Sequence, residues 1–244
     1  MKKLVSILIP TRKRVKHLKH LLEKFNAHTK NYSCVEILIR LDNDDRETQN
    51  YFNISSDNKI YIAKCGKIDT KIIVGERLEG YKDVATFFNE MYRLSTGKWL
   101  WFFLDDAHII TDNWDLILCK IECNQIVLPQ QEGNENWCDV PIIPKSFADY
   151  LGYATPGGPD GYWIKIGRKF NIIKKANKKN NLHIEYVHME RTGNVAGGET
   201  RDEVQNILKN DKQFINHDPR WWQESVVNEM ADKIKELLNK EKIS

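Results

Sequence analysis

The first hundred residues alternate between strand-like and helix-like hydrophobic patterns, and this alternation restricts the possible folds more than any other feature. Leu4–Ile9 is a run of apolar residues typical of a strand that is buried on both faces of a sheet. Apolar side chains then recur at helical spacing from Val15 to Phe25. Because strand and helix patterns follow one another in this way, the sequence predicts an α/β fold with a largely parallel central sheet.

Similar patterns predict further elements along the chain. Residues 154–160 contain two prolines and two glycines, so they predict a loop. Asp218 and Pro219 are favourable residues at the start of a helix, and the apolar spacing predicts that this last helix runs to about Lys240. The expected strands are 35–41, 59–62, 71–74, 99–104 and 126–129, and the other expected helices are 83–94, 114–121 and 145–151.

Charge and composition exclude several classes of protein. The 37 Lys and Arg residues nearly balance the 34 Asp and Glu residues, so the net charge of +3 disfavours a dedicated nucleic-acid binder. The longest apolar run, Trp99–Leu104, is too short to cross a bilayer, and the N-terminal apolar run is too short for a signal peptide and stops at Pro10. Five cysteines without a C-x-x-C pair indicate reduced thiols, so we expect a cytoplasmic protein.

Polar residues follow three of the predicted strands. They are Pro10–Arg12, Asp42–Asp45 and Asp105–His108. Ligands of open α/β sheets bind at the carboxyl ends of strands. Two consecutive carboxylates after a buried strand are unfavourable without a compensating positive group, and a divalent cation that carries phosphates is the usual one. The simpler alternative is that Asp105 or Asp106 caps the turn that follows.

These segments together resemble a known family. Val5–Arg12, a strand that ends in an acidic cluster, Gly80–Ala85 leading to Asn89, and a strand that ends in Asp105-Asp106 are similar to the nucleotide-binding half of family 2 glycosyltransferases. The resemblance covers about residues 4–110 and continues more loosely to about 195. It implies a GT-A fold, which is a Rossmann-like three-layer sandwich. The implied divisions are a nucleotide-sugar-binding half (1–110), an acceptor-side half (111–200) and a C-terminal helical extension (201–244).

The resemblance also implies roles for single residues. Asp42 would accept a hydrogen bond from the base, Asp105 would approach the ribose, and Asp106 would hold a metal ion. Ala107 departs from the usual Asp-x-Asp motif, so Asp105-Asp106 must be aligned as x-Asp-Asp. The residues expected to bind the nucleotide are Pro10, Thr11, Arg12, Asp42, Lys82 and Asp105.

The expected catalytic base is Asp160, because the family has its base on a loop between the metal motif and a following helix. A glycine-rich loop would let it move as the acceptor enters. Asp139 and Asp149 are rival carboxylates. His188 resembles the late histidine that completes the metal site in many GT-A enzymes, with His108 as its competitor. The implied cofactor is a divalent cation, Mn²⁺ or Mg²⁺.

Aromatic and basic residues suggest further contacts. Trp163 is the best candidate for stacking on a sugar because it lies close to Asp160 in the sequence, whereas core packing is the default for Trp137, Trp221 and Trp222. A basic face of the first predicted helix suggests peripheral contact with an anionic membrane, and a simply solvated face is the alternative. This face is formed by Lys13, Arg14, Lys16 and Lys19.

The resemblance therefore implies a metal-dependent, inverting glycosyltransferase. Its partners would be a nucleotide-diphosphate sugar donor and a glycan, lipid-linked or other hydroxyl acceptor, and no nucleic acid. A sugar nucleotidyltransferase is one alternative, but no glycine-rich loop follows the first strand. A catalytically inactive nucleotide-sugar or glycan-binding module is the other, and Ala107 is the main argument for it.

Overall fold

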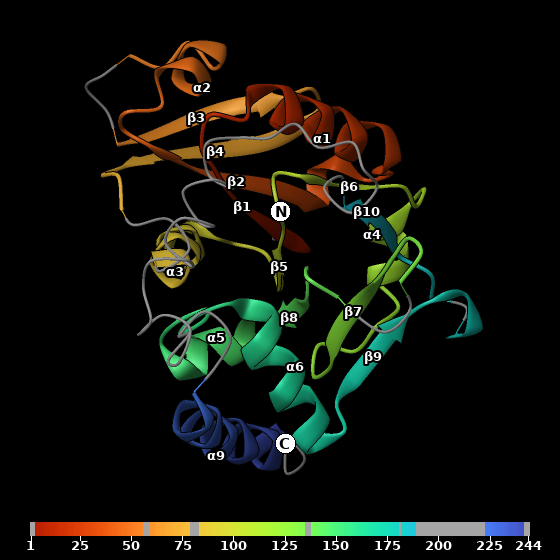
Figure 1. Ribbon diagram of the computed structural model, residues 1–244. Coiled ribbons are helices and arrows are strands. Elements are labelled where there is room, and N and C mark those ends of the chain that lie inside the picture. The colour runs from red at the N-terminus through yellow and green to blue at the C-terminus, as the bar shows by residue number, and fades with distance from the viewer. Residues whose placement is uncertain are drawn as a thin grey trace.

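Ten strands of the described chain form the central sheet (Figure 1). The computed structural model describes residues 3–55, 59–78, 83–134, 138–180, 182–188 and 223–241. The strand order is β3-β4-β2-β1-β5-β8-β7-β10-β6, and β9 pairs with β7 outside this path. The strands are β1 (Val5–Thr11), β2 (Val35–Asp42), β3 (Ile60–Cys65), β4 (Ile68–Gly75), β5 (Trp99–Phe102), β6 (Ala107–Ile109), β7 (Ile126–Gln131), β8 (Ile142–Pro144), β9 (Ile173–Ala176) and β10 (Glu185–His188).

The centre of the sheet is parallel. Strands β4, β2, β1 and β5 run in the same direction, whereas β3 and β8 join them antiparallel. Strands β9 and β10 are parallel to β7. The predicted α/β fold with a mostly parallel sheet is therefore confirmed. We call the edge where β1, β2, β4 and β5 end the carboxyl edge, and the opposite edge the amino edge.

Helices cover both faces of the sheet, which makes the three layers visible in Figure 1. On one face, Leu18, Leu22 and Phe25 of α1 pack with alternate residues of β1 and β2 and with α4. On the other face, α3, α5 and α6 pack on the remaining strand residues. The helices are α1 (Val15–His28), α2 (Arg46–Tyr51), α3 (Val84–Leu94), α4 (Trp114–Leu118), α5 (Lys145–Leu151), α6 (Pro159–Phe170) and α9 (Glu224–Glu241), with 3₁₀ turns η1 (Tyr32–Cys34) and η3 (Lys178–Asn180).

The predicted C-terminal helix is present as α9. Its apolar face, which includes Val227, Met230 and Ile234, is buried in the same cluster as residues of α5 and α6. Its predicted start at Asp218 lies outside the described residues. Among the described residues, no helix combines the length and apolar character that crossing a membrane requires.

One predicted loop is shorter than expected. Regular structure was not expected before residue 161, yet α6 begins at Pro159, with Gly158 as its N-cap residue. Proline is well tolerated in the first turn of a helix because the missing N–H would have no partner there. Consequently Asp160 lies in the first turn of a helix and not on a loop, and the prediction of a loop that lets it move was wrong.

A buried carboxylate stabilises the amino edge. Glu36 of β2 accepts hydrogen bonds from the hydroxyls of Ser6 at 2.6 Å and Thr96 at 2.9 Å, and Lys71 of β4 lies 2.9 Å away. The backbone N–H of Gly97 donates to the same Ser6 hydroxyl at 2.8 Å. Burial acts to raise the pKa of Glu36, but these hydrogen bonds together hold it below its ordinary value. Glu36 therefore joins β1, β2 and β4 to the turn between α3 and β5.

We expect Glu36→Gln to lower the free energy of unfolding by about 2 to 3 kcal/mol at neutral pH, because an amide N–H would then face hydrogen-bond donors. Since the folded pKa lies below the ordinary value of 4.5, the carboxylate stabilises the fold above that pH, and its contribution is lost as the pH falls through the folded pKa. Urea unfolding should therefore show a difference between the two proteins that shrinks below pH 4.5. The control Asp69→Asn removes an exposed carboxylate and should cost less than about 0.5 kcal/mol. A difference that does not change with pH would contradict this role.

Candidate active site

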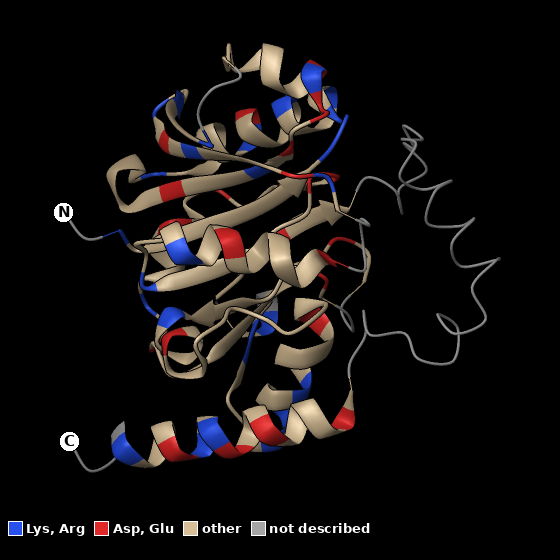
Figure 2. Ribbon diagram, turned by 90° about the vertical axis from the view of Figure 1, so that its left-hand side faces the viewer, with Lys and Arg blue, Asp and Glu red and all other residues tan. Residues whose placement is uncertain are grey.

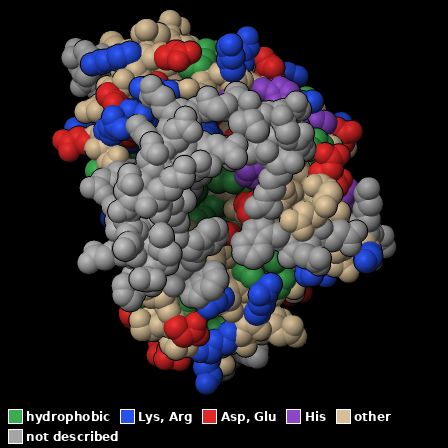
Figure 3. Space-filling view, viewed as in Figure 1, with side chains coloured by type: hydrophobic (Ala, Val, Ile, Leu, Met, Phe, Trp, Pro, Cys, Tyr) green, Lys and Arg blue, Asp and Glu red, His purple; other side chains and the backbone are tan. Residues whose placement is uncertain are grey.

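Three strand ends meet at the carboxyl edge. Because β1 lies between β2 and β5, the segment Thr11–Arg14 lies between Asp42–Asp45 and Asp105–Asp106. Acidic segments lie at this edge in Figure 2. Figure 3 shows the molecule with the carboxyl edge toward the viewer, and acidic, histidine and hydrophobic side chains are visible near the centre. The structure thus brings the predicted strand ends together.

Arg12 binds the acidic cluster at the end of β2. Its Nε atom lies 3.0 Å from Oδ2 of Asp42, and its Nη2 atom lies 2.8 Å from Oδ2 of Asp44. Arg40, within β2, is a second partner of Asp42. Burial raises the pKa of Asp42, while the charges of Arg40 and Arg12 oppose this effect. Two guanidinium groups therefore hold this buried carboxylate in position at the edge of the sheet.

Arg14 binds the second acidic cluster. Its Nη1 atom lies 2.9 Å from Oδ1 of Asp105 and 3.2 Å from Oδ2 of Asp106. The Thr11 hydroxyl donates a hydrogen bond to the other oxygen of Asp105 at 2.7 Å. Both aspartates are buried. The positive group that this carboxylate pair requires is thus present within the protein, and the sequence analysis did not predict it.

His188 faces the remaining oxygen of Asp106. The Nε2 atom of His188 lies 3.9 Å from Oδ1 of Asp106, which is too long for a hydrogen bond. The Nδ1 atom of His188 is buried and has no hydrogen-bond partner. A carboxylate oxygen and an imidazole nitrogen are a donor pair that suits Mn²⁺. The two side chains thus bring one oxygen and one nitrogen donor within 3.9 Å of each other, so this pair fits a divalent cation.

The described residues supply only part of a coordination shell. No group of three His, Cys, Asp or Glu side chains that could hold a metal ion occurs among them.

The register of β6 and β10 distinguishes His188 from its competitor. His188 pairs with Ala107, whose side chain is fully buried in the core. His108 follows Ala107 in β6, so its side chain points to the opposite face of the sheet from those of Ala107 and His188. There His108 packs against His20, with ring centroids 4.7 Å apart. Burial, together with the nearby charges of His20, Lys24 and His28, lowers the pKa of His108 to about 4. The structure therefore places His188, and not His108, beside Asp106.

Asp160 lies near the same edge. Helix α6 follows the turn after α5 and leads back to β9, which starts at the amino edge, so the first turn of α6 lies on the carboxyl side. Asp160 is half-buried there. Burial raises the pKa of the Cys138 thiol, and the neighbouring charges of Asp139 and Asp160 add to this rise. Asp139 and Asp160 therefore both lie near Cys138.

The third candidate carboxylate lies elsewhere. Asp149 accepts a hydrogen bond from the Tyr92 hydroxyl at 2.8 Å and is paired with Lys145. Tyr92 lies in the last turn of α3, just before β5 begins, and Lys145 starts α5 directly after β8, which ends at the same edge. Asp149 is consequently at the amino edge, away from Asp106, whereas the other two of these three candidates, Asp139 and Asp160, lie near Cys138.

Asn89 connects α3 to the segment before α6. Its side-chain nitrogen donates to the Thr155 carbonyl at 2.8 Å, and its oxygen accepts from the N–H groups of Ala154 at 2.7 Å and Thr155 at 3.2 Å. Trp163 donates to the Ala154 carbonyl at 2.9 Å and is completely buried. The prediction that Trp163 stacks on a sugar was therefore wrong, because its ring fills the core beneath α6.

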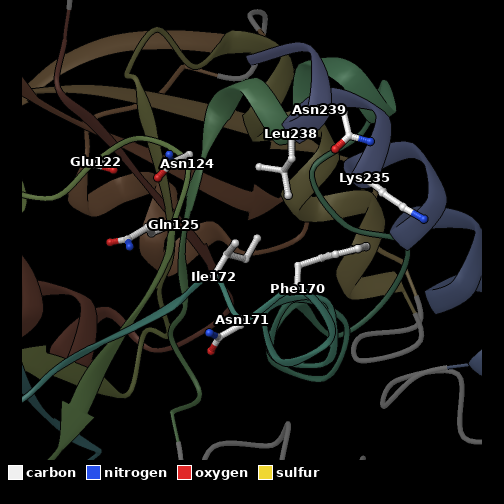
Figure 4. Close-up of a pocket in the computed structure, with 9 residues that line it drawn as sticks. All are labelled: Glu122, Asn124, Gln125, Phe170, Asn171, Ile172, Lys235, Leu238 and Asn239. Atoms are coloured by element: carbon white, nitrogen blue, oxygen red, sulfur yellow. The ribbon is translucent and has the colours of Figure 1, made fainter. Parts of the chain in front are cut away.

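A cavity of about 380 Å³ lies at the other end of the molecule (Figure 4). It is bordered by Phe170 at the end of α6, Ile172 just after it, Gln125 before β7, and Lys235 and Leu238 of α9. Because β7 begins at the amino edge, this cavity is on the side opposite Asp105 and Asp106. We therefore separate it from the candidate active site.

Some predicted residues cannot be placed. Lys82, Trp137, Trp221 and Trp222 lie outside the described residues. Conversely, the sequence pattern assigned Arg14 to an exposed basic face of the first helix and did not predict its position beside Asp105 and Asp106. Only 11% of its side chain is exposed. The alternation Arg12-Lys13-Arg14 directly after a strand was the available signal.

Comparison with known proteins supports the fold. No protein-family model and no curated protein sequence matches this chain. Solved structures do match. The crystal structure of S. aureus TarS 1–349 in complex with UDP has a TM-score of 0.55 at 13% identity, over 75% of this chain and 60% of that chain. The corresponding complex with UDP-GlcNAc has a TM-score of 0.55 at 12% identity, over 95% and 71%.

A third solved structure is the mannosyltransferase PcManGT from Pyrobaculum calidifontis in complex with GDP-Man and Mn²⁺. It has a TM-score of 0.52 at 10% identity, over 72% of this chain and 54% of that chain. This chain thus spans just over half the length of PcManGT and 60% of the UDP-bound TarS chain. At such low identity the likeness establishes the fold, which is of the GT-A type.

We expect Asn89→Ala to lower the free energy of unfolding by about 2 kcal/mol, because three backbone groups of Ala154 and Thr155 lose a partner. Hydrogen exchange should show faster exchange of these two amides. The control Asn180→Ala removes an exposed hydrogen bond to the Lys175 carbonyl and should change stability by less than about 0.5 kcal/mol. Unchanged exchange at residues 154 and 155 would contradict the role given to Asn89.

Proposed function

We propose that this chain transfers a sugar from a nucleoside-diphosphate donor to a hydroxyl acceptor, in a reaction that depends on a divalent cation. The observation that carries the proposal is the buried pair Asp105-Asp106 at the carboxyl end of β5, with His188 facing Asp106 across a gap. This pair lies on a GT-A sheet, at the edge where such sheets bind ligands. The resemblance at residues 4–110 supports a family 2 glycosyltransferase.

The donor nucleotide would bind at the ends of β1 and β2. Asp42, whose position Arg12 and Arg40 maintain, would accept a hydrogen bond from the base, and Asp105 would accept one from the ribose. The other proposed contacts are Pro10, Thr11, Arg12 and Lys82. The binding of UDP, UDP-GlcNAc and GDP-Man by proteins of the same fold supports this class of donor.

Asp106 and His188 would hold the cation. Bound there, Mn²⁺ or Mg²⁺ would neutralise negative charge on the departing diphosphate. Within the described part of the chain, Asp106 and His188 supply one oxygen and one nitrogen at this position, and oxygens of the donor diphosphate would add to the shell. Mn²⁺ in the complex of PcManGT supports a metal of this kind.

Asp160 would act as the general base. Its carboxylate would take the proton of the acceptor hydroxyl as that oxygen attacks the sugar carbon, and the configuration at this carbon would be inverted. The first turn of α6 presents it from the acceptor-side half of the chain, and Asp139 is the alternative. The acceptor would be a glycan, a lipid-linked compound or another hydroxyl compound.

Donor binding and hydrolysis test the proposed function. UDP-, GDP- and dTDP-sugars are incubated with the protein with and without Mn²⁺, and both thermal stability and released nucleoside diphosphate are measured. One donor should stabilise the fold by about 2.7 kcal/mol at 100 times its dissociation constant and be slowly hydrolysed, only with metal. Asp106→Asn should lose both effects, and the matched variant Asp149→Asn at the amino edge should keep both. Stabilisation without hydrolysis would indicate an inactive binding module, and neither effect with any donor would reject the function.

A separate variant tests the base. Asp160→Asn should retain donor and metal affinity, while turnover at saturating acceptor falls by about 10²- to 10⁴-fold, because the base acts only on the acceptor proton. Asparagine is close in shape to aspartate and keeps a polar group in the first turn of α6. Near-normal turnover would exclude Asp160 and favour Asp139. Loss of donor binding as well would show that Asp160 has a structural role.

A further inference from the structure

A positively charged side chain, that of Arg14, lies at the acidic pair where the cation is proposed to bind. Arg14 contacts both Asp105 and Asp106 through a single atom, Nη1, at 2.9 and 3.2 Å. About a tenth of each of these three side chains is exposed. Two adjacent carboxylates with so little solvent contact repel each other strongly unless a positive charge lies between them. Arg14 supplies that charge in the protein without a metal ion.

The position of Arg14 is determined by the segment that precedes it. Lys13 has a φ of +53°, a conformation that is unfavourable for a residue with a side chain, and its N–H donates to Oδ2 of Asp45 at 2.7 Å. Thr11, two residues before Lys13, donates a hydrogen bond from its hydroxyl to Asp105. Arg12 reaches the end of β2 and Arg14 the end of β5. The contact of Arg14 with the acidic pair is therefore built into the turn between β1 and α1.

Asp106 divides its two oxygens between different partners. Oδ2 accepts from Arg14, and Oδ1 faces His188 across 3.9 Å. A cation between Asp106 and His188 would therefore share one small carboxylate with a guanidinium group. Two positive charges within a few ångströms of each other repel, and the repulsion is strong at a partly buried site because little solvent screens it.

We propose that Arg14 is a built-in counter-cation of the Asp105-Asp106 pair, which competes with a divalent cation for Asp106 and so sets how tightly that cation binds. The inference rests on the proposed function, because the cation site is the one proposed there. By thermodynamic linkage, the part of the Arg14–Asp106 interaction that is lost when the cation binds lowers the metal affinity by the same free energy. The Asp105-Asp106 pair then has a positive partner, Arg14, even when no metal ion is bound. A divalent cation alone therefore binds weakly, and it binds more tightly when the donor diphosphate is also present.

Metal binding to single-residue variants tests this inference. Free Mn²⁺ is measured by electron paramagnetic resonance during titration of the protein without nucleotide. Arg14→Gln should bind Mn²⁺ about tenfold more tightly than the wild type. Arg14→Lys should lie between them, because a shorter side chain with a compact charge reaches the two carboxylates less well. Lys16→Gln removes a charge from the exposed side of α1 and should leave the dissociation constant unchanged within about twofold.

Thermal unfolding supplies a second measurement. Without metal, Arg14→Gln should melt below the wild type, and added Mn²⁺ should raise its melting temperature more than it raises that of the wild type. A purely structural role of Arg14 would lower stability without any gain in metal affinity. If Arg14→Gln does not fold, the order of Arg14→Lys and the wild type decides the question. Equal or weaker Mn²⁺ binding by the Arg14 variants, or no Mn²⁺ binding by any of the proteins, would overturn the inference.

The inference and the proposed function can fail separately. Metal-dependent hydrolysis of a donor by the wild type, combined with unchanged Mn²⁺ affinity in Arg14→Gln, would reject the role of Arg14 alone. Tighter Mn²⁺ binding by Arg14→Gln, with no donor bound or hydrolysed by the wild type, would support the role of Arg14 and reject the proposed function alone.

Discussion

The segment Thr11–Arg14 lies between two buried acidic strand ends, and the arrangement of the carboxyl edge depends on how it distributes its positive charges. Carboxylates are expensive to bury without a partner, and β2 and β5 each end in more than one. Arg12 is directed to the first cluster and Arg14 to the second, on either side of the left-handed turn at Lys13. One short connection thus stabilises both sides of the proposed donor site.

The buried carboxylates at the two edges of the sheet differ in their surroundings. At the amino edge, Glu36 is surrounded by hydroxyl, backbone and ammonium donors, which is an arrangement for stability. At the carboxyl edge, one oxygen of Asp106 faces His188 at a distance too long for a hydrogen bond. The Nδ1 atom of His188 is buried there without a hydrogen-bond partner, and such polar groups are expected where a ligand binds. This contrast is the physical reason for locating function at the carboxyl edge.

An amide side chain connects the two halves of the proposed site. Asn89 belongs to α3, which leads into β5 and so to Asp105 and Asp106, yet it binds the backbone of residues 154 and 155 just before α6. Asp160 therefore keeps a defined place relative to the donor side, although the two are far apart in sequence. Its location in the first turn of a helix makes it less mobile than a residue on a loop would be.

The sequence by itself determined the α/β alternation of the first hundred residues, the parallel centre of the sheet, and the strand ends at which acidic residues gather. These features depend on local hydrophobic period and on residues that directly follow a strand, and both can be read along the chain. The end of α5 at Gly152 and the apolar face of α9 also follow from such local patterns. The sequence did not predict α2, β8, β9 or the start of α6 at Pro159.

Only the tertiary structure decided which side chains meet. The choice of His188 over His108 depended on the register between β6 and β10, and the exclusion of Asp149 depended on the edge from which α5 starts. Trp163 lies in the core and not at a sugar site, and Arg14 contacts the acidic pair and does not lie on an exposed basic helix face. Tertiary packing determines both positions. Long-range packing sets such contacts, and the local pattern carries no information about them.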